Sequence, residues 1–141
     1  MFQRILVGTD GSGTAGAAVA HAAELAKIGG SELIVVSAFK QPEDAPPPFG
    51  TPEGHHTAEI SKAILHDVEK RYGGDVKLRT VMREGSPVDA IVDVASDEKV
   101  DVIVVGNRGM AGAKRFVLGS VPNAVSHHAP CHVLIVHTTD E

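Results

Sequence analysis

The chain has few of the residues on which cross-links and redox cofactors depend. It contains one cysteine, Cys131, no tryptophan and one tyrosine among 141 residues. A single cysteine excludes an intramolecular disulfide, and its place in an apolar run predicts a buried, unreactive thiol. The scarcity of aromatic rings also disfavours a flavin-binding electron carrier, because such carriers hold the flavin between aromatic side chains.

The chain also has no excess of basic residues and no long apolar run. The chain has 13 lysines and arginines against 18 aspartates and glutamates, a formal net charge of -5. Nucleic-acid binding needs a concentrated basic face, and a membrane-spanning helix needs roughly 18 or more consecutive apolar residues. The opening residues MFQRILVGTD do not have the pattern of a secretory signal. We therefore expect a soluble, cytoplasmic protein that binds neither nucleic acid nor membrane.

Several familiar site patterns are absent as well. The eight histidines do not place two imidazoles at i, i+4 on one predicted helix, so we expect no metal site built from side chains. Ser120 lacks the Gly-x-Ser-x-Gly setting of a hydrolase nucleophile. The GxxxxGK[ST] phosphate loop is absent, and Gly8, Gly11 and Gly13 have GxxGxG spacing. We therefore expect a ligand site of another kind.

Short aliphatic runs alternate with helical patterns along the whole chain. The runs predict strands at 4–9, 32–38, 76–82, 101–106 and 131–137, and the patterns between them predict helices at 12–27, 57–72, 86–95 and about 120–128. Three of the runs are continuously apolar, which is typical of strands with helices on both faces. This order predicts an α/β fold, a Rossmann-like, doubly wound, five-stranded parallel sheet with helices on both faces.

The length predicts one domain spanning residues 1–141. A proline-rich stretch at 41–56 interrupts it, and we interpret this stretch as a mobile loop near the carboxyl edge of the sheet. Helix starts are expected at Ser12, at Thr57 and at Ser86. The apolar faces expected to pack on the sheet are Ile60, Ile64, Leu65 and Val68 in the second helix and Val88, Ile91, Val92 and Ala95 in the third.

Two loops at the carboxyl ends of predicted strands are rich in glycine. The first strand is followed by Gly8-Thr9-Asp10-Gly11-Ser12, and the fourth by Gly106-Asn107-Arg108-Gly109 with Gly119-Ser120 further on. Open α/β sheets bind ligands at this edge. Glycine lets main-chain N–H groups approach a phosphate, and a helix that begins at Ser120 attracts an anion. The sequence therefore predicts a phosphate site formed by the main chain.

Each of these loops also has a simpler explanation. Asp10 and Ser12 fit an Asx-type turn that caps the following helix, and taken alone the first loop fits this role better than ligand binding. Arg108, Lys114 and Arg115 either add positive charge to the phosphate site or lie on the surface as solvated cations.

The second loop resembles the nucleotide-binding signature of the universal stress protein family, in its ATP-binding branch. It reads Gly106-x2-Gly109-x9-Gly119-Ser120, and the likeness extends to RILVGTDGS, GSPVDAIVDVA, VDVIVVG and PCHVLIV. The resemblance implies the strand order 3-2-1-4-5 and a homodimer formed through the last strand, at 131–137. It implies a protein that binds ATP, cyclic AMP or AMP and acts as a stress-response sensor or nucleotide reservoir.

The resemblance also implies the residues that contact the nucleotide. The glycines and Ser120 hold the phosphates and ribose, Asp10 contacts the adenosine, and the main chain at Gly8 and Ala38 lines the adenine slot. The full expected set is Gly8, Thr9, Asp10, Ala38, Gly106, Asn107, Arg108, Gly109, Gly119, Ser120 and Val121. Any Mg²⁺ arrives with the phosphates. We expect no enzyme and at most slow ATP hydrolysis, because Asp10 is the only acidic residue placed to assist it.

Two alternatives remain from the sequence. One is a dimeric interaction module of the same fold that has no nucleotide, and it would not need the glycines. The other is a phosphorylatable receiver domain, which would need an acidic pair after the first strand and a lysine after the fifth. This chain has Thr9-Asp10 and His137-Thr138 at those places.

Overall fold

The computed structural model describes residues 2–41, 57–107 and 120–138. These parts of the chain contain five strands, β1 (Arg4–Gly8), β2 (Glu32–Phe39), β3 (Lys77–Glu84), β4 (Val102–Gly106) and β5 (His132–Val136). They also contain four helices, α1 (Gly13–Gly29), α2 (Ala58–Tyr72), α3 (Pro87–Asp97) and α4 (Ser120–His128). Apart from Gln41, the proline-rich stretch lies outside the described residues.

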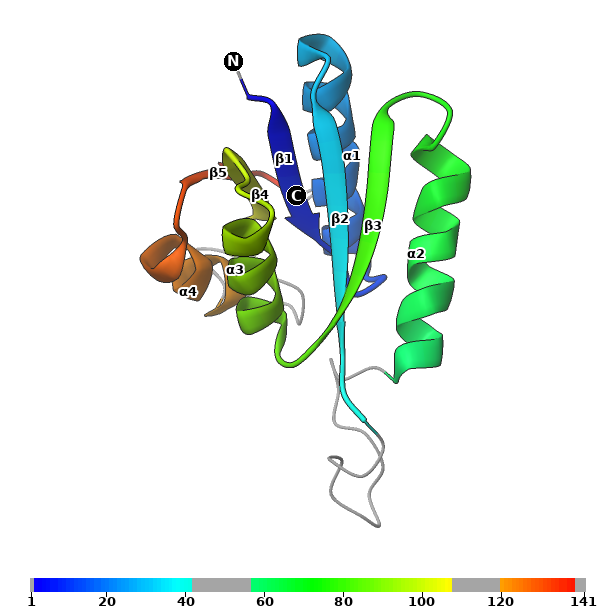
Figure 1. The fold of residues 1–141 in the computed structure, drawn as a ribbon, viewed down its shortest axis with the longest axis vertical. Helices are drawn as coiled ribbons and strands as arrows, with labels where there is room; N and C mark the ends of the chain where they lie inside the picture. Colours follow the sequence, from blue (N-terminus) through cyan, green and yellow to red (C-terminus); the bar gives the residue numbers. More distant parts are fainter. Residues whose placement is uncertain (1, 42–56, 108–119, 139–141) are drawn as a thin grey trace.

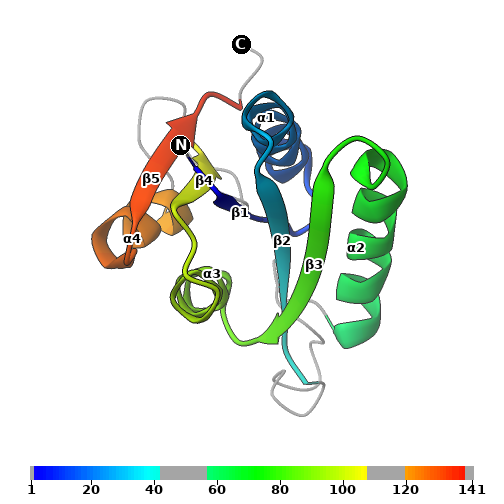
Figure 2. The same ribbon diagram turned by 45° about the horizontal axis from the view of Figure 1, so that its top comes forward.

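The five strands form one parallel sheet in the order β3-β2-β1-β4-β5. α1 and α2 cover one face of the sheet, and α3 and α4 cover the other (Figures 1 and 2). The predicted Rossmann-like fold and its strand order are confirmed. None of the helices in the described parts has the length and apolar character needed to cross a membrane.

The central strands are apolar on both faces because helices cover both. In β1, Ile5 and Val7 pack under α1 and α2, whereas Leu6 between them packs under α3 and α4. All three side chains are completely buried. Burying one such side chain contributes about 1.5–3 kcal/mol to stability. The continuous aliphatic runs in the sequence therefore reflect two cores, one on each side of the sheet.

The helices begin at the expected capping residues. Ser12, Thr57 and Ser86 each accept a hydrogen bond from the main-chain N–H three residues further along. α1 ends at Gly30, which adopts a left-handed φ of 66° that glycine tolerates without steric cost. Local sequence thus fixes where these helices start and where α1 stops.

The apolar faces of α2 and α3 are confirmed in part, since Leu65 and Val68 in α2 and Ile91 and Ala95 in α3 are buried. In α2, Ser61 is fully buried while Ile60 is 45% exposed. In α3, the buried residues are Ala90, Ile91, Val94 and Ala95. Ser61 and Ala90 were not expected on these faces, because small side chains do not stand out in an apolar pattern.

Cys131, expected to be buried, is only half-buried, and desolvation raises the pKa of its thiol.

Charged side chains connect the elements at the amino edge of the sheet. Arg79 contacts Glu32 (Nε–Oε2 3.4 Å) and Glu98 (Nη2–Oε1 2.7 Å). Arg4 donates to the main-chain oxygen of Glu98 at 2.7 Å. The hydrogen bond from Arg79 lowers the pKa of the Glu98 carboxyl. This edge is therefore held by ion pairs between strands and the end of α3.

Asp101 ties the same edge to the start of β1. One of its carboxylate oxygens accepts hydrogen bonds from the main-chain N–H groups of Arg4 (2.9 Å) and Gln3 (2.8 Å). These two bonds lower the pKa of the Asp101 carboxyl. The ionised form of Asp101 is therefore the form that stabilises the fold.

We predict that Asp101→Asn lowers the melting temperature at neutral pH and that the loss disappears in acid. Above the unfolded pKa of about 3.9 the native carboxylate contributes fully, and this contribution is lost as pH falls through its lower folded pKa. Thermal unfolding from about pH 7 to pH 2.5 measures the difference. Asp93→Asn, at an exposed position of α3, is the control. A difference that stays constant across this range contradicts the prediction.

Candidate functional site

A pocket of about 310 Å³, including its open mouth, lies at the carboxyl ends of β1 and β4. The chain leaves β1 towards β2 and β3 on one side, whereas β4 and β5 lie on the other. This is the point of reversal at which open α/β sheets bind ligands. The pocket is lined by Gly8, Thr14, Ala15, Ala18, Ile91, Val104, Val105, Gly106, Val121 and Pro122.

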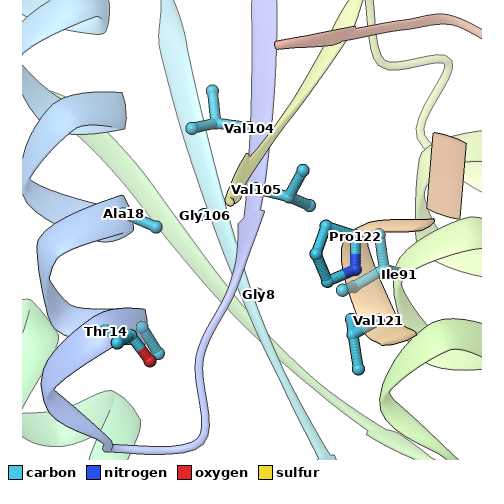
Figure 3. A pocket seen from close by; sticks show the side chains of 10 residues that line it. Gly8, Thr14, Ala18, Ile91, Val104, Val105, Gly106, Val121 and Pro122 are labelled. Carbon is cyan, nitrogen blue, oxygen red and sulfur yellow. The ribbon is translucent and has the colours of Figure 1, made fainter. Parts of the chain in front are cut away.

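The starts of two helices form opposite walls of this pocket (Figure 3). Thr14 and Ala18 of α1 stand on one side, and Val121 and Pro122 of α4 stand on the other. The ends of β1 and β4 lie between them, and both end in glycine. The described lining contains no ionisable side chain. Main-chain groups therefore supply much of its polar surface.

Electrostatics at this pocket favour an anion. The first N–H groups of a helix have no partner within the helix, and the helix dipole makes this end positive. α1 and α4 have no acidic residue in their first turns, whereas α2 has Glu59 and α3 has Asp89 there. The first turns of the two helices that begin at the pocket therefore contain no carboxylate.

The loop after β1 is a tight turn with internal hydrogen bonds. Asp10 Oδ1 accepts from the N–H of Ser12 at 2.9 Å, and Thr9 Oγ1 accepts from the N–H of Gly11 at 3.1 Å. The capping role considered for Asp10 and Ser12 is therefore present, and a role of Asp10 in ligand binding stays a prediction. Thr9 is buried and lines a separate groove between α1 and α2.

The segment after β5 packs over the end of β4. Asn107 Oδ1 accepts from the main-chain N–H of Thr138 at 3.0 Å, and the Thr138 hydroxyl lies 3.3 Å from the same oxygen. A Cβ on Gly106 would lie 2.7 Å from Thr138 Cγ2. Gly106 is therefore required by packing against Thr138 as well as lining the pocket. The packing role is not visible in the sequence, because Thr138 lies far from Gly106 along the chain.

Ala38 lies at the same edge, where β2 runs past the end of β1. On the side facing β1, the N–H of Thr9 donates to the main-chain oxygen of Val36 at 2.9 Å. Successive peptide groups of a strand point to opposite sides, so the N–H and C=O of Ala38 also point to this side. β1 itself ends at Gly8. The peptide groups of Ala38 thus form a main-chain edge beyond the end of the neighbouring strand.

The structure brings together part of the expected set. Gly8, Gly106 and Val121 line the pocket, and Ser120 begins the helix beside it. Arg108, Gly109 and Gly119 lie outside the described residues. Within the described residues, no group of three or more His, Cys, Asp or Glu side chains is placed to hold a metal ion.

Several lining residues were not identified from the sequence. Thr14 and Ala15 follow the Ser12 cap, so the cap position itself is a signal that places them in the first turn. Ile91 and Pro122 give no such signal, because they reach the pocket only through the packing of α3 and α4 on the sheet.

Comparisons with known proteins point to one family. A family model described as the universal stress protein family matches residues 1–137. The universal stress protein Rv1636 of Mycobacterium tuberculosis is 40% identical over 147 residues, with 98% of each chain covered. A crystal structure of a universal stress protein in complex with cyclic AMP shares 34% identity and a TM-score of 0.73 over 98% of both chains. The structure of protein MJ0577 is 25% identical with a TM-score of 0.79, over 100% of this chain and 99% of that one.

We predict that Gly106→Ala destabilises the fold by about 1–3 kcal/mol, because its new Cβ meets Thr138. Thr138→Ala removes the two atoms that this Cβ would approach most closely. The double variant should therefore lose less stability than the sum of the single variants, as measured by denaturant unfolding. Gly74→Ala, whose Cβ would meet nothing within 4 Å, is the control. Additive losses would show that the two sites do not interact.

Proposed function

The chain belongs to the universal stress protein family, and on this basis we propose that it binds an adenine nucleotide between the ends of β1 and β4. The observation that carries the proposal is the meeting of two helix N-termini with glycine-ended strands at the reversal point of the sheet. Such a site favours phosphate groups without basic side chains. The related protein crystallised with cyclic AMP supports an adenine nucleotide as the ligand.

The nucleotide is oriented by main-chain groups in this proposal. Its phosphates lie against the first turn of α4, at Ser120 and Val121, and its adenosine lies towards Asp10. The base reaches Ala38, whose N–H and C=O point past the end of β1. One donor and one acceptor side by side match the ring nitrogen and the exocyclic amino group of adenine.

We propose a sensor or nucleotide reservoir rather than an efficient catalyst, acting in the cytoplasm. The described lining of the pocket offers no ionisable side chain as a base for phosphoryl transfer. Any Mg²⁺ is brought by the phosphates. Hydrolysis of bound ATP is therefore expected to be slow.

We predict that Ser120→Asp weakens binding of ATP and cyclic AMP by about tenfold or more, because a carboxylate at the start of α4 repels the phosphates. The same charge is favourable to the helix dipole, so the melting temperature should not fall. Calorimetric titration measures the affinities. Ser120→Asn is the control of similar size, and its affinity should stay within about threefold of the native value.

Mass spectrometry of small molecules released from freshly purified protein identifies the preferred nucleotide. Equal affinities of the Asp and Asn variants would contradict the position assigned to the phosphates. A native chain that binds no adenine nucleotide would contradict the proposed function and leave an interaction module of the same fold.

We also propose a homodimer formed through β5. This strand is at the edge of the sheet, and its Leu134 and Ile135 are 41% and 42% exposed. An apolar strand with an open edge tends to pair with another strand. Pairing of β5 with a second copy would extend the sheet and cover both side chains.

We predict that the double variant Leu134→Lys/Ile135→Lys is monomeric while the native chain is dimeric. Placing like charges on both copies opposes pairing across the shared edge. Light scattering at micromolar concentrations reports the mass of each protein. Ile28→Lys is the control, since Ile28 is 79% exposed on α1, away from β5. A native chain that is monomeric under these conditions would refute the dimer.

A further inference from the structure

Two serines lie completely buried between β2 and α2. Ser37 Oγ donates to Ser61 Oγ at 3.0 Å, and Ser61 Oγ donates to the main-chain oxygen of Ala38 at 3.0 Å. Both residues are 0% exposed. Burying a hydroxyl costs free energy unless it is hydrogen-bonded, and alanine would fill either position without that cost. The two hydroxyls form a relay that ends on a single carbonyl group, that of Ala38.

The direction of this relay is fixed by its surroundings. A hydroxyl group has one hydrogen, and Ser61 gives its hydrogen to the carbonyl of Ala38 whether or not it also accepts the hydrogen of Ser37. Ser61 is held in place by α2, because its N–H donates to the main-chain oxygen of Thr57 at 3.0 Å and Leu65 on the same face is buried. The donor that faces the Ala38 carbonyl therefore has little freedom to move.

The Ala38 carbonyl at the end of the relay belongs to a strand but has no neighbouring strand on the side to which it points. The carbonyl points to the side on which β1 lies, but it is two residues beyond Val36, whose oxygen accepts from Thr9 just after β1 ends. No strand residue therefore donates a hydrogen bond to the Ala38 carbonyl from that side. A carbonyl oxygen has two lone pairs, and Ser61 uses one of them. Within the described residues no second hydrogen bond to this oxygen is present, so the other lone pair is available to a ligand.

We propose that Ser61 is a positioning residue for base selection, acting through the carbonyl of Ala38. This inference rests on the proposed binding of an adenine nucleotide. With the carbonyl held by Ser61, its remaining lone pair accepts a hydrogen bond from an amino group at position 6 of a purine. A keto oxygen at that position offers no hydrogen and repels the carbonyl. Ser61 thus sets the preference for adenine over hypoxanthine, whereas the phosphate contacts are the same for both bases.

The test compares nucleotides that differ only at the base. Calorimetry gives the affinities of ATP and ITP, and of cyclic AMP and cyclic IMP, for the native chain and for Ser61→Ala. We expect the native chain to prefer adenine by about tenfold or more, and Ser61→Ala to reduce this ratio by about three- to tenfold. Because both nucleotides share ribose and phosphates, a general loosening of the fold weakens both and leaves the ratio unchanged.

Ser37→Ala is the matched control. It also removes a buried hydroxyl and should lower the melting temperature by a similar amount, but it leaves the hydroxyl of Ser61 in contact with Ala38. Its base ratio should stay within about twofold of the native one. Ser61→Thr retains the hydroxyl and should keep the preference. If Ser61→Ala does not fold, Ser61→Cys replaces it, because a thiol of similar size is only a weak donor.

The outcomes separate this inference from the proposed function. A base ratio that falls in Ser61→Ala but not in Ser37→Ala supports the inference. An unchanged ratio in Ser61→Ala, or an equal fall in both variants, overturns it while ATP binding by the native chain leaves the proposed function standing. Failure of the native chain to bind any of the four nucleotides overturns both.

Discussion

Complete burial of the central strands determines where main-chain hydrogen-bonding groups stay available. Within the sheet, each buried N–H and C=O must pair with a neighbouring strand. Apart from the outer edges of β3 and β5, such groups stay available past the strand ends and in the first turns of helices. β1 ends at Gly8 beside a longer β2, and α1 and α4 begin at the same edge. The pocket lies where these two helix starts meet the ends of β1 and β4.

Residues in the pocket and in the loops beside it have roles in the fold as well as in the proposed ligand binding. Gly106 is required by Thr138, Asp10 holds the turn before α1, and Ser12 caps that helix. A glycine or an aspartate at these positions is therefore not evidence of binding by itself. What distinguishes this edge is that two helix N-termini, free of acidic residues in their first turns, face each other across it. The role of these residues in the fold and the proposed binding of an anion are compatible, because the proposed phosphate contacts use main-chain groups.

The sequence predicted features that depend on local or periodic patterns. The strands, the caps at Ser12, Thr57 and Ser86, and the fold class could be read in this way, because burial and capping leave regular traces. The contact of Thr138 with Asn107 joins the ends of β4 and β5, so its two partners lie 31 residues apart in the chain. The buried position of Ser61 was also missed, since a small polar residue does not stand out on an apolar helix face. Such features follow from tertiary packing alone.

Charged residues hold the sheet together at its amino edge. Arg79, Glu98 and Asp101 join the strands and the end of α3 at the edge opposite the pocket. These contacts lie at the far ends of the strands from the pocket, so a substitution in a loop at the carboxyl edge leaves them in place. The amino edge thus acts as a clamp on the sheet that works independently of whatever the opposite edge binds.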